Sequence, residues 1–132
     1  MYLTPIADVI VPVYILWLSN PFFIALLFLA VVLIEAAVLR ALNWGPFLRS
    51  LLDSFLMNLA STLVGFFLIN TLVEMGLAGV LLAWAISVVV EGFFLALTRL
   101  HTPRRAFLAA LSANLTSYLL IVPATWLIET LR

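Results

Sequence analysis

Residues 22–69 read FFIALLFLAVVLIEAAVLRALNWGPFLRSLLDSFLMNLASTLVGFFLI, two apolar runs separated by the tetrapeptide NWGP. Each run is long enough for a helix to cross the hydrocarbon core of a bilayer, which takes about 20 residues. Asn, Gly and Pro within four positions are typical of a turn. The stretch therefore predicts a helical hairpin, with membrane-crossing helices over residues 22–42 and 48–69.

Two further apolar runs follow, over residues 77–98 and 105–128. Gly76 precedes the first of them, and Thr102-Pro103 precedes the second. Pro123 lies inside the last run and should kink that helix or end its regular part. The runs are continuous rather than alternating, which disfavours barrel strands. We therefore expect an all-α integral membrane protein with four transmembrane helices.

The composition narrows the classes of function. Of 132 residues, 67% are hydrophobic and 9% are charged. In a soluble domain, roughly 45–50% of the residues are apolar and about 25% are charged. The high hydrophobic fraction indicates that the chain lies in a lipid bilayer. The net charge of zero gives no electrostatic reason to expect a nucleic-acid partner. With no cysteine and one histidine, we expect no metal and no cofactor. No HExxH, GxSxG or GxGxxG motif occurs, and we do not expect an enzyme.

The segment over residues 1–20 is apolar but short. As a helix, its core over residues 5–18 would extend only about 21 Å, less than the roughly 30 Å of the hydrocarbon core. We expect a short N-terminal interfacial or re-entrant helix, with a fifth span as the alternative. Residues 1–19 contain no Lys or Arg, so we do not expect a cleaved signal.

The arginines predict an orientation. Five of the six flank the loops after the first and third helices, namely Arg40, Arg49, Arg99, Arg104 and Arg105. The positive-inside rule places these loops in the cytoplasm and both termini outside, in a plasma (inner) membrane. Trp44 is then expected at the inner aromatic belt, and Trp17 and Trp126 at the outer one.

A pattern of rare residues recurs along the chain. Glu35, Asn58 and Ser61 are followed, each 56 positions later, by Glu91, Asn114 and Ser117, and Arg49 by Arg105. We interpret this as a repeat of two hairpins, residues 21–76 and 77–132, within one membrane domain over residues 1–132. Both copies enter the membrane in the same direction, so the repeat is parallel. Coincidence is the alternative, because membrane helix interfaces commonly collect Asn and Ser.

These six residues form the candidate intramembrane site: Glu35, Glu91, Asn58, Asn114, Ser61 and Ser117. Such groups at this depth cost a few kcal/mol unless they face the protein interior or a water-filled cavity, so the two glutamates and the two asparagines should point inward. In one interpretation the carboxyl groups are protonated or paired and lock the bundle. In the other they line a path for a proton or a cation, since carboxylate and amide oxygens suit hard cations.

Two functions follow from the two interpretations. The first is a small transporter or channel-like protein for protons, cations or small solutes, expected to be a homo-oligomer. The alternative is a non-catalytic accessory or structural subunit of a larger membrane complex. A transporter needs its glutamates around a shared, water-accessible space, whereas an accessory subunit needs them sealed or directed at a partner chain.

Overall fold

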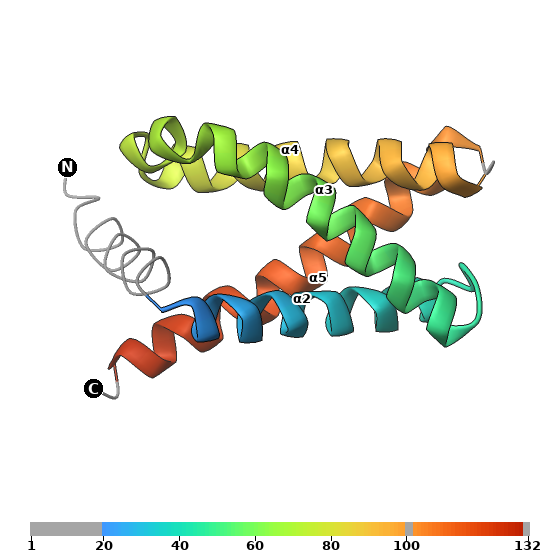
Figure 1. The fold of residues 1–132 in the computed structure, drawn as a ribbon, viewed down its shortest axis with the longest axis horizontal. Coiled ribbons are helices and arrows are strands. Elements are labelled where there is room, and N and C mark those ends of the chain that lie inside the picture. The colour runs from blue at the N-terminus through green and yellow to red at the C-terminus, as the bar shows by residue number, and fades with distance from the viewer. Residues whose placement is uncertain (1–19, 100–101, 131–132) are drawn as a thin grey trace.

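The computed structural model describes residues 20–99 and 102–130, with side chains for residues 20–98 and 102–124. In chain order the helices are α2 (Pro21–Ala41), α3 (Phe47–Glu74), α4 (Leu77–Arg99) and α5 (Pro103–Thr130) (Figure 1). All four are long and apolar enough to cross a membrane. This confirms the expected all-helical class. The expected N-terminal helix lies at residues outside the described ranges.

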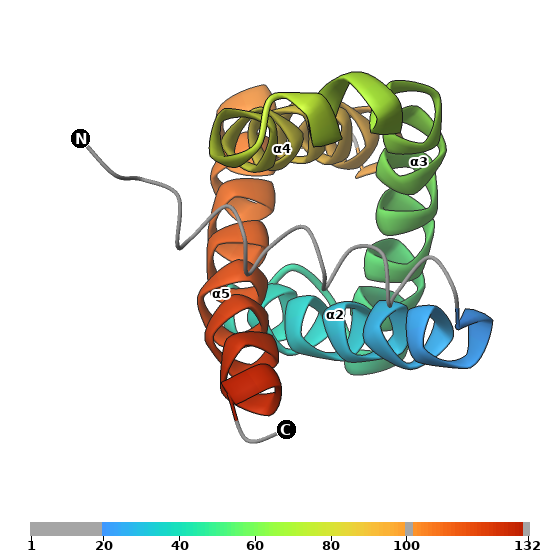
Figure 2. The same ribbon diagram turned by 90° about the vertical axis from the view of Figure 1, so that its left-hand side faces the viewer.

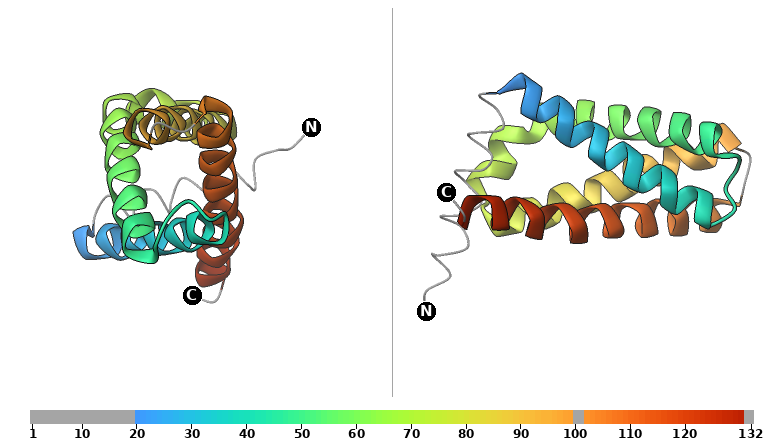
Figure 3. Two further views of the ribbon diagram at one scale, coloured as in Figure 1. Left: turned by 90° about the vertical axis from the view of Figure 1, so that its right-hand side faces the viewer. Right: turned by 90° about the horizontal axis from the view of Figure 1, so that it is seen from below.

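The four helices form a ring. Each contacts its two neighbours, in the order α2, α3, α4, α5 and back to α2. Seen end-on, they make the four sides of a square, with α2 opposite α4 and α3 opposite α5 (Figure 2; Figure 3, left). The α2–α3 connection, the end of α4 and the start of α5 lie at the same end of the bundle (Figure 1).

Local signals in the sequence explain where α2 begins and ends. The Asn20 side chain accepts hydrogen bonds from the amides of Phe22 and Phe23, as an N-cap does. At the other end Asn43 has a positive φ of 55°, and the amides of Asn43 and Trp44 donate to the carbonyls of Arg40 and Leu39. This pattern is a Schellman motif, which satisfies the last carbonyls of a helix.

One expected helix boundary is wrong. The sequence predicts that the second helix ends near Asn70, but α3 continues to Glu74, because no strong helix breaker precedes Gly76, whose φ is +57°. The last helix contains Pro123, as predicted, and of the two effects expected there, a kink or an end, the structure excludes the end. Helix α5 continues through Pro123 to Thr130, and membrane helices tolerate proline where neighbouring groups satisfy the released carbonyl.

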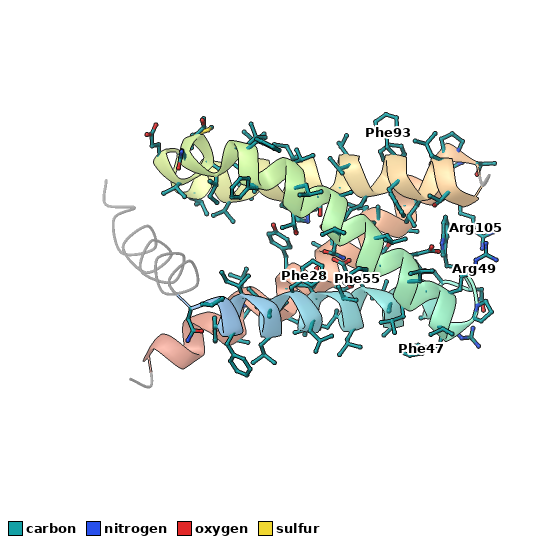
Figure 4. The ribbon with its side chains drawn as sticks, in the orientation of Figure 1. Phe28, Phe47, Arg49, Phe55, Phe93 and Arg105 are labelled. Carbon is teal, nitrogen blue, oxygen red and sulfur yellow. The ribbon has the colours of Figure 1, made fainter. Side chains whose placement is uncertain are left out.

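Polar side chains lie inside the bundle and large apolar ones outside. The core contains Leu39, Met57, Leu95 and several alanines of α5, together with two glutamates, two asparagines and four serines. Phe67, Leu48 and Phe22 are among the most exposed side chains. Figure 4 shows many such side chains directed away from the ribbon. This distribution suits lipid, which solvates apolar groups and cannot hydrogen-bond polar ones.

A close approach between α3 and α4 depends on Gly79. A Cβ atom added there would lie 1.8 Å from the backbone oxygen of Leu72, a distance that no rotamer change can relieve. A Cβ atom added at Gly65, in the middle of α3, would meet nothing within 4 Å. A side chain therefore cannot be accommodated at Gly79 without moving the helices apart, whereas Gly65 has free space around it.

We predict that Gly79→Ala destabilises the protein and that Gly65→Ala does not. Overpacking should cost about 1–3 kcal/mol at Gly79, whereas at Gly65 alanine should be neutral or improve helix propensity by up to about 1 kcal/mol. Unfolding in a titration of SDS against mild detergent, followed by circular dichroism, measures both. Equal effects of the two substitutions would contradict this packing of α3 on α4.

Candidate functional site: a buried Glu–Asn–Ser network

The six candidate residues are brought together in the bundle interior. Glu35 comes from α2, Asn58 and Ser61 from α3, Glu91 from α4, and Asn114 and Ser117 from α5. All six are buried, and each glutamate is only 1% exposed. The helical spacing of Asn58 with Ser61, and of Asn114 with Ser117, places each pair on one face.

The first carboxyl group, that of Glu35, binds side chains from two other helices. The Asn58 amide donates to Glu35 Oε2, and Ser117 Oγ donates to Glu35 Oε1 at 3.0 Å. Ser54 adds a longer contact of 3.5 Å to Oε2, and its hydroxyl donates to the Val32 carbonyl at 2.9 Å. Glu35 thus connects α2 to α3 and to α5.

The second carboxyl group, that of Glu91, has the corresponding partners. The Asn114 amide donates to Glu91 Oε2 at 2.5 Å, and Ser61 Oγ donates to Glu91 Oε1 at 2.8 Å. No second serine joins this cluster, since Ala110 stands 56 positions after Ser54. Glu91 thus connects α4 to α5 and to α3.

The pairing crosses between the two hairpins. Each glutamate takes its asparagine from its own hairpin and its serine from the other one. The two serine bonds therefore join α5 to α2 and α3 to α4, where the ring of helices closes. At this depth in the bundle, the other contacts between the hairpins involve mainly apolar and small residues, which gain little over contact with lipid.

The asparagine amides are held in place by their own helices. Asn58 Nδ2 also donates to the Ser54 carbonyl at 2.9 Å, and Asn114 Nδ2 to the Ala110 carbonyl at 3.1 Å. One amide hydrogen thus fixes the side chain while the other reaches the glutamate. This anchoring orients the donor toward the glutamate.

Each serine hydroxyl lies near two acceptors. Ser61 Oγ is 2.8 Å from Glu91 Oε1 and 3.1 Å from the Asn58 carbonyl oxygen. Ser117 Oγ is 3.0 Å from both Glu35 Oε1 and the Asn114 carbonyl oxygen. A hydroxyl has one hydrogen, so the two acceptors must share it in a three-centre bond, unless the glutamate position supplies a donor to the serine oxygen. A protonated carboxyl group or a glutamine amide would be such a donor.

No charged partner accompanies the two carboxyl groups. Every hydrogen-bond partner that the described part of the chain gives to Glu35 and Glu91 is a serine or an asparagine. Within residues 20–99 and 102–124, no group of three His, Cys, Asp or Glu side chains is placed to hold a metal ion. The arrangement can thus make neutral hydrogen bonds or pass a proton, but offers no cation a carboxylate-rich cage.

The structure differs from the sequence-based predictions at two residues. Ser54 joins the Glu35 cluster; it lies four residues before Asn58 on the same helix face, but it was not among the six predicted site residues. Trp44 was expected in the inner aromatic belt, but its side chain is turned inward. Its ring is 6% exposed, and its indole N–H donates to Asp53 Oδ2 at 3.1 Å, because the α2–α3 turn folds it inward. The side chains of Trp17 and Trp126 are outside the described ones.

Comparisons of the chain with protein-family models, with curated proteins and with solved structures give no significant match. The site must therefore be interpreted from its own geometry.

We predict that Ser117→Ala lowers the free energy of unfolding by about 1 kcal/mol, because it removes a hydrogen bond between hairpins. Ser112→Ala is the matched control on the same helix, since the Ser112 hydroxyl donates only to the Leu108 carbonyl of its own helix. SDS titration followed by circular dichroism compares them. If Ser112→Ala lowers the free energy of unfolding as much as Ser117→Ala does, the hydrogen bond from Ser117 to Glu35 is contradicted.

Proposed function

We propose that this chain is a non-catalytic structural or accessory subunit of a membrane assembly, and that its polar core holds its own helices together. The main support is the sealing of the two glutamates. Each is 1% exposed, and each has its oxygens occupied by asparagine and serine donors from neighbouring helices. A path for solutes would require these oxygens to meet water.

We further propose that residues 21–76 and 77–132 are two copies of one hairpin. The burial pattern supports this, because residues 56 positions apart are buried in both halves. The buried pairs include Glu35 and Glu91, Leu39 and Leu95, Ser50 and Ala106, Ser54 and Ala110, Met57 and Ala113, Asn58 and Asn114, and Ser61 and Ser117. The crossed hydrogen bonds also map onto themselves when the halves are exchanged.

The proposed orientation places the arginine-rich end of the bundle in the cytoplasm and both termini outside. Arg49 and Arg105 lie at one end, where the α2–α3 connection, the end of α4 and the start of α5 also lie (Figure 4). A concentration of arginine on one side is what the positive-inside rule associates with the cytoplasm.

The outer surface limits how such a subunit could associate with others. The buried polar groups are used within the bundle, so a neighbouring chain in the membrane would meet mainly apolar side chains such as Phe67, Leu97 and Phe66. Association would then depend on shape and van der Waals packing. A second copy of this chain or a larger membrane complex is the partner that fits this surface.

Transport of protons or cations is the second candidate function, and one observation favours it. Two carboxyl groups lie deep in a membrane bundle without a basic partner among the described residues, and ionisable groups at such positions commonly serve conduction paths. In this case the described arrangement would be an occluded state.

One double substitution separates the candidates. We predict that Glu35→Gln with Glu91→Gln changes the free energy of unfolding by less than about 1 kcal/mol, because glutamine offers an oxygen to the asparagine and an amide to the serine. Glu35→Ala with Glu91→Ala should lose more than about 2 kcal/mol, because both asparagine donors lose their acceptors. The wild type in proteoliposomes should carry no proton or cation flux above protein-free vesicles.

The exposed Glu74, at the end of α3, provides the control variant Glu74→Gln. A flux in the wild type that persists in this control and disappears in the double glutamine variant would replace our proposal with transport. A collapse of the fold in the double glutamine variant would also contradict it, since the network would then need charged carboxylates.

A further inference from the structure

A groove lies at the arginine-rich end of the bundle, apart from the Glu–Asn–Ser network. Its volume is about 350 Å³, within the usual range of roughly 300–1,000 Å³ for ligand sites. It runs between the first turns of α5 and the end of α2. Its mouth is formed by Thr102, Arg104, Arg105 and Trp44.

The mouth carries two positive charges in adjacent positions. Arg105 donates one hydrogen bond to the Asn43 carbonyl at 3.3 Å, and its guanidinium carbon lies 5.8 Å from the centre of the Trp44 ring. These contacts hold the side chain over the groove and leave most of its five N–H groups available. The exposed Arg104 has no hydrogen bond or ion pair within the part of the chain that the structure describes.

The interior of the groove has a different character. Further along α5 its walls are Leu108, Ala109 and Ser112, and Leu42 lines it from the end of α2. The Ser112 hydroxyl is already bonded to its own helix. Ser112 lies seven residues beyond Arg105, about 10 Å along the helix. The wall therefore extends from the arginine-rich end of the bundle toward the middle of α5.

We propose that this groove binds an anionic phospholipid, with its phosphate on Arg104 and Arg105 and one acyl chain along α5. Guanidinium groups bind phosphate through paired N–H donors, and basic pockets between membrane helices are suited to anionic headgroups. A free phosphate would use only the mouth, whereas the apolar wall fits an amphiphile. Asp53 does not oppose the phosphate directly, because it is 3% exposed and binds the indole N–H of Trp44.

The test is native mass spectrometry of the full chain in neutral detergent. Phosphatidylglycerol and phosphatidylcholine with the same acyl chains are titrated separately, and glycerol 3-phosphate serves as a headgroup without chains. We expect phosphatidylglycerol to be retained in preference to phosphatidylcholine by roughly 25-fold, since each basic residue near an anionic headgroup contributes about fivefold. Glycerol 3-phosphate should not displace it at equal concentration.

Variants assign the binding to the groove. The double variant Arg104→Gln with Arg105→Gln should abolish the preference for phosphatidylglycerol over phosphatidylcholine. The control variant Arg40→Gln with Arg49→Gln removes an equal charge outside the groove and should keep this preference. Ser112→Phe, which narrows the wall without changing charge, should weaken retention of the lipid. Circular dichroism confirms that each variant folds.

Three results would overturn the proposal. The first is an equal loss in the two arginine pairs, which would indicate diffuse attraction of anions to a basic surface. The second is displacement of the lipid by glycerol 3-phosphate, which would indicate a site for phosphate alone. The third is unchanged retention in Ser112→Phe, which would leave the apolar wall without a role.

Discussion

The carboxyl oxygens of Glu35 and Glu91 lie where there is no water to hydrogen-bond them, and the arrangement of the bundle follows from how they are satisfied. An unsatisfied polar group in hydrocarbon costs several kcal/mol, which is comparable to the whole stability of a small domain. Each glutamate must therefore find donors on other helices. It finds an asparagine within its hairpin and a serine in the other hairpin.

This requirement also fixes the register of the helices. In an α-helix one residue corresponds to a rotation of about 100°, so a shift of one position would turn a serine away from its glutamate. Apolar packing alone tolerates such shifts, because leucine and phenylalanine contact lipid and protein almost equally well. The hydrogen bonds thus supply the specificity, while small residues such as Gly79 and the alanines of α5 let the helices approach closely enough to form them.

The sequence could predict which residues gather but not how they pair. Four apolar runs and the rarity of Glu, Asn and Ser within them were enough to indicate four membrane helices and an inward-facing polar cluster. The crossing of serines between hairpins depends on the tilt of helices around the ring, which residue spacing does not contain.

The position of Trp44 could not be predicted for a similar reason. From the sequence alone, a tryptophan in a turn between two membrane helices is expected in the aromatic belt. Only the conformation of the turn shows that the indole N–H binds Asp53 instead. Pro123 does not end α5, because a membrane helix can satisfy the carbonyl that proline releases more readily than a helix in water can.

The claim that serine–glutamate bonds join the two hairpins is tested most directly by a double-mutant cycle across them. Unfolding free energies are measured for Glu35→Ala, Ser117→Ala and the double variant, with Glu35→Ala and Ser112→Ala as the control cycle. We expect a coupling free energy of about 0.5–2 kcal/mol between Glu35 and Ser117, and additivity within about 0.3 kcal/mol in the control cycle. Additive effects of Glu35 and Ser117, with no coupling beyond that of the control pair, would contradict this claim.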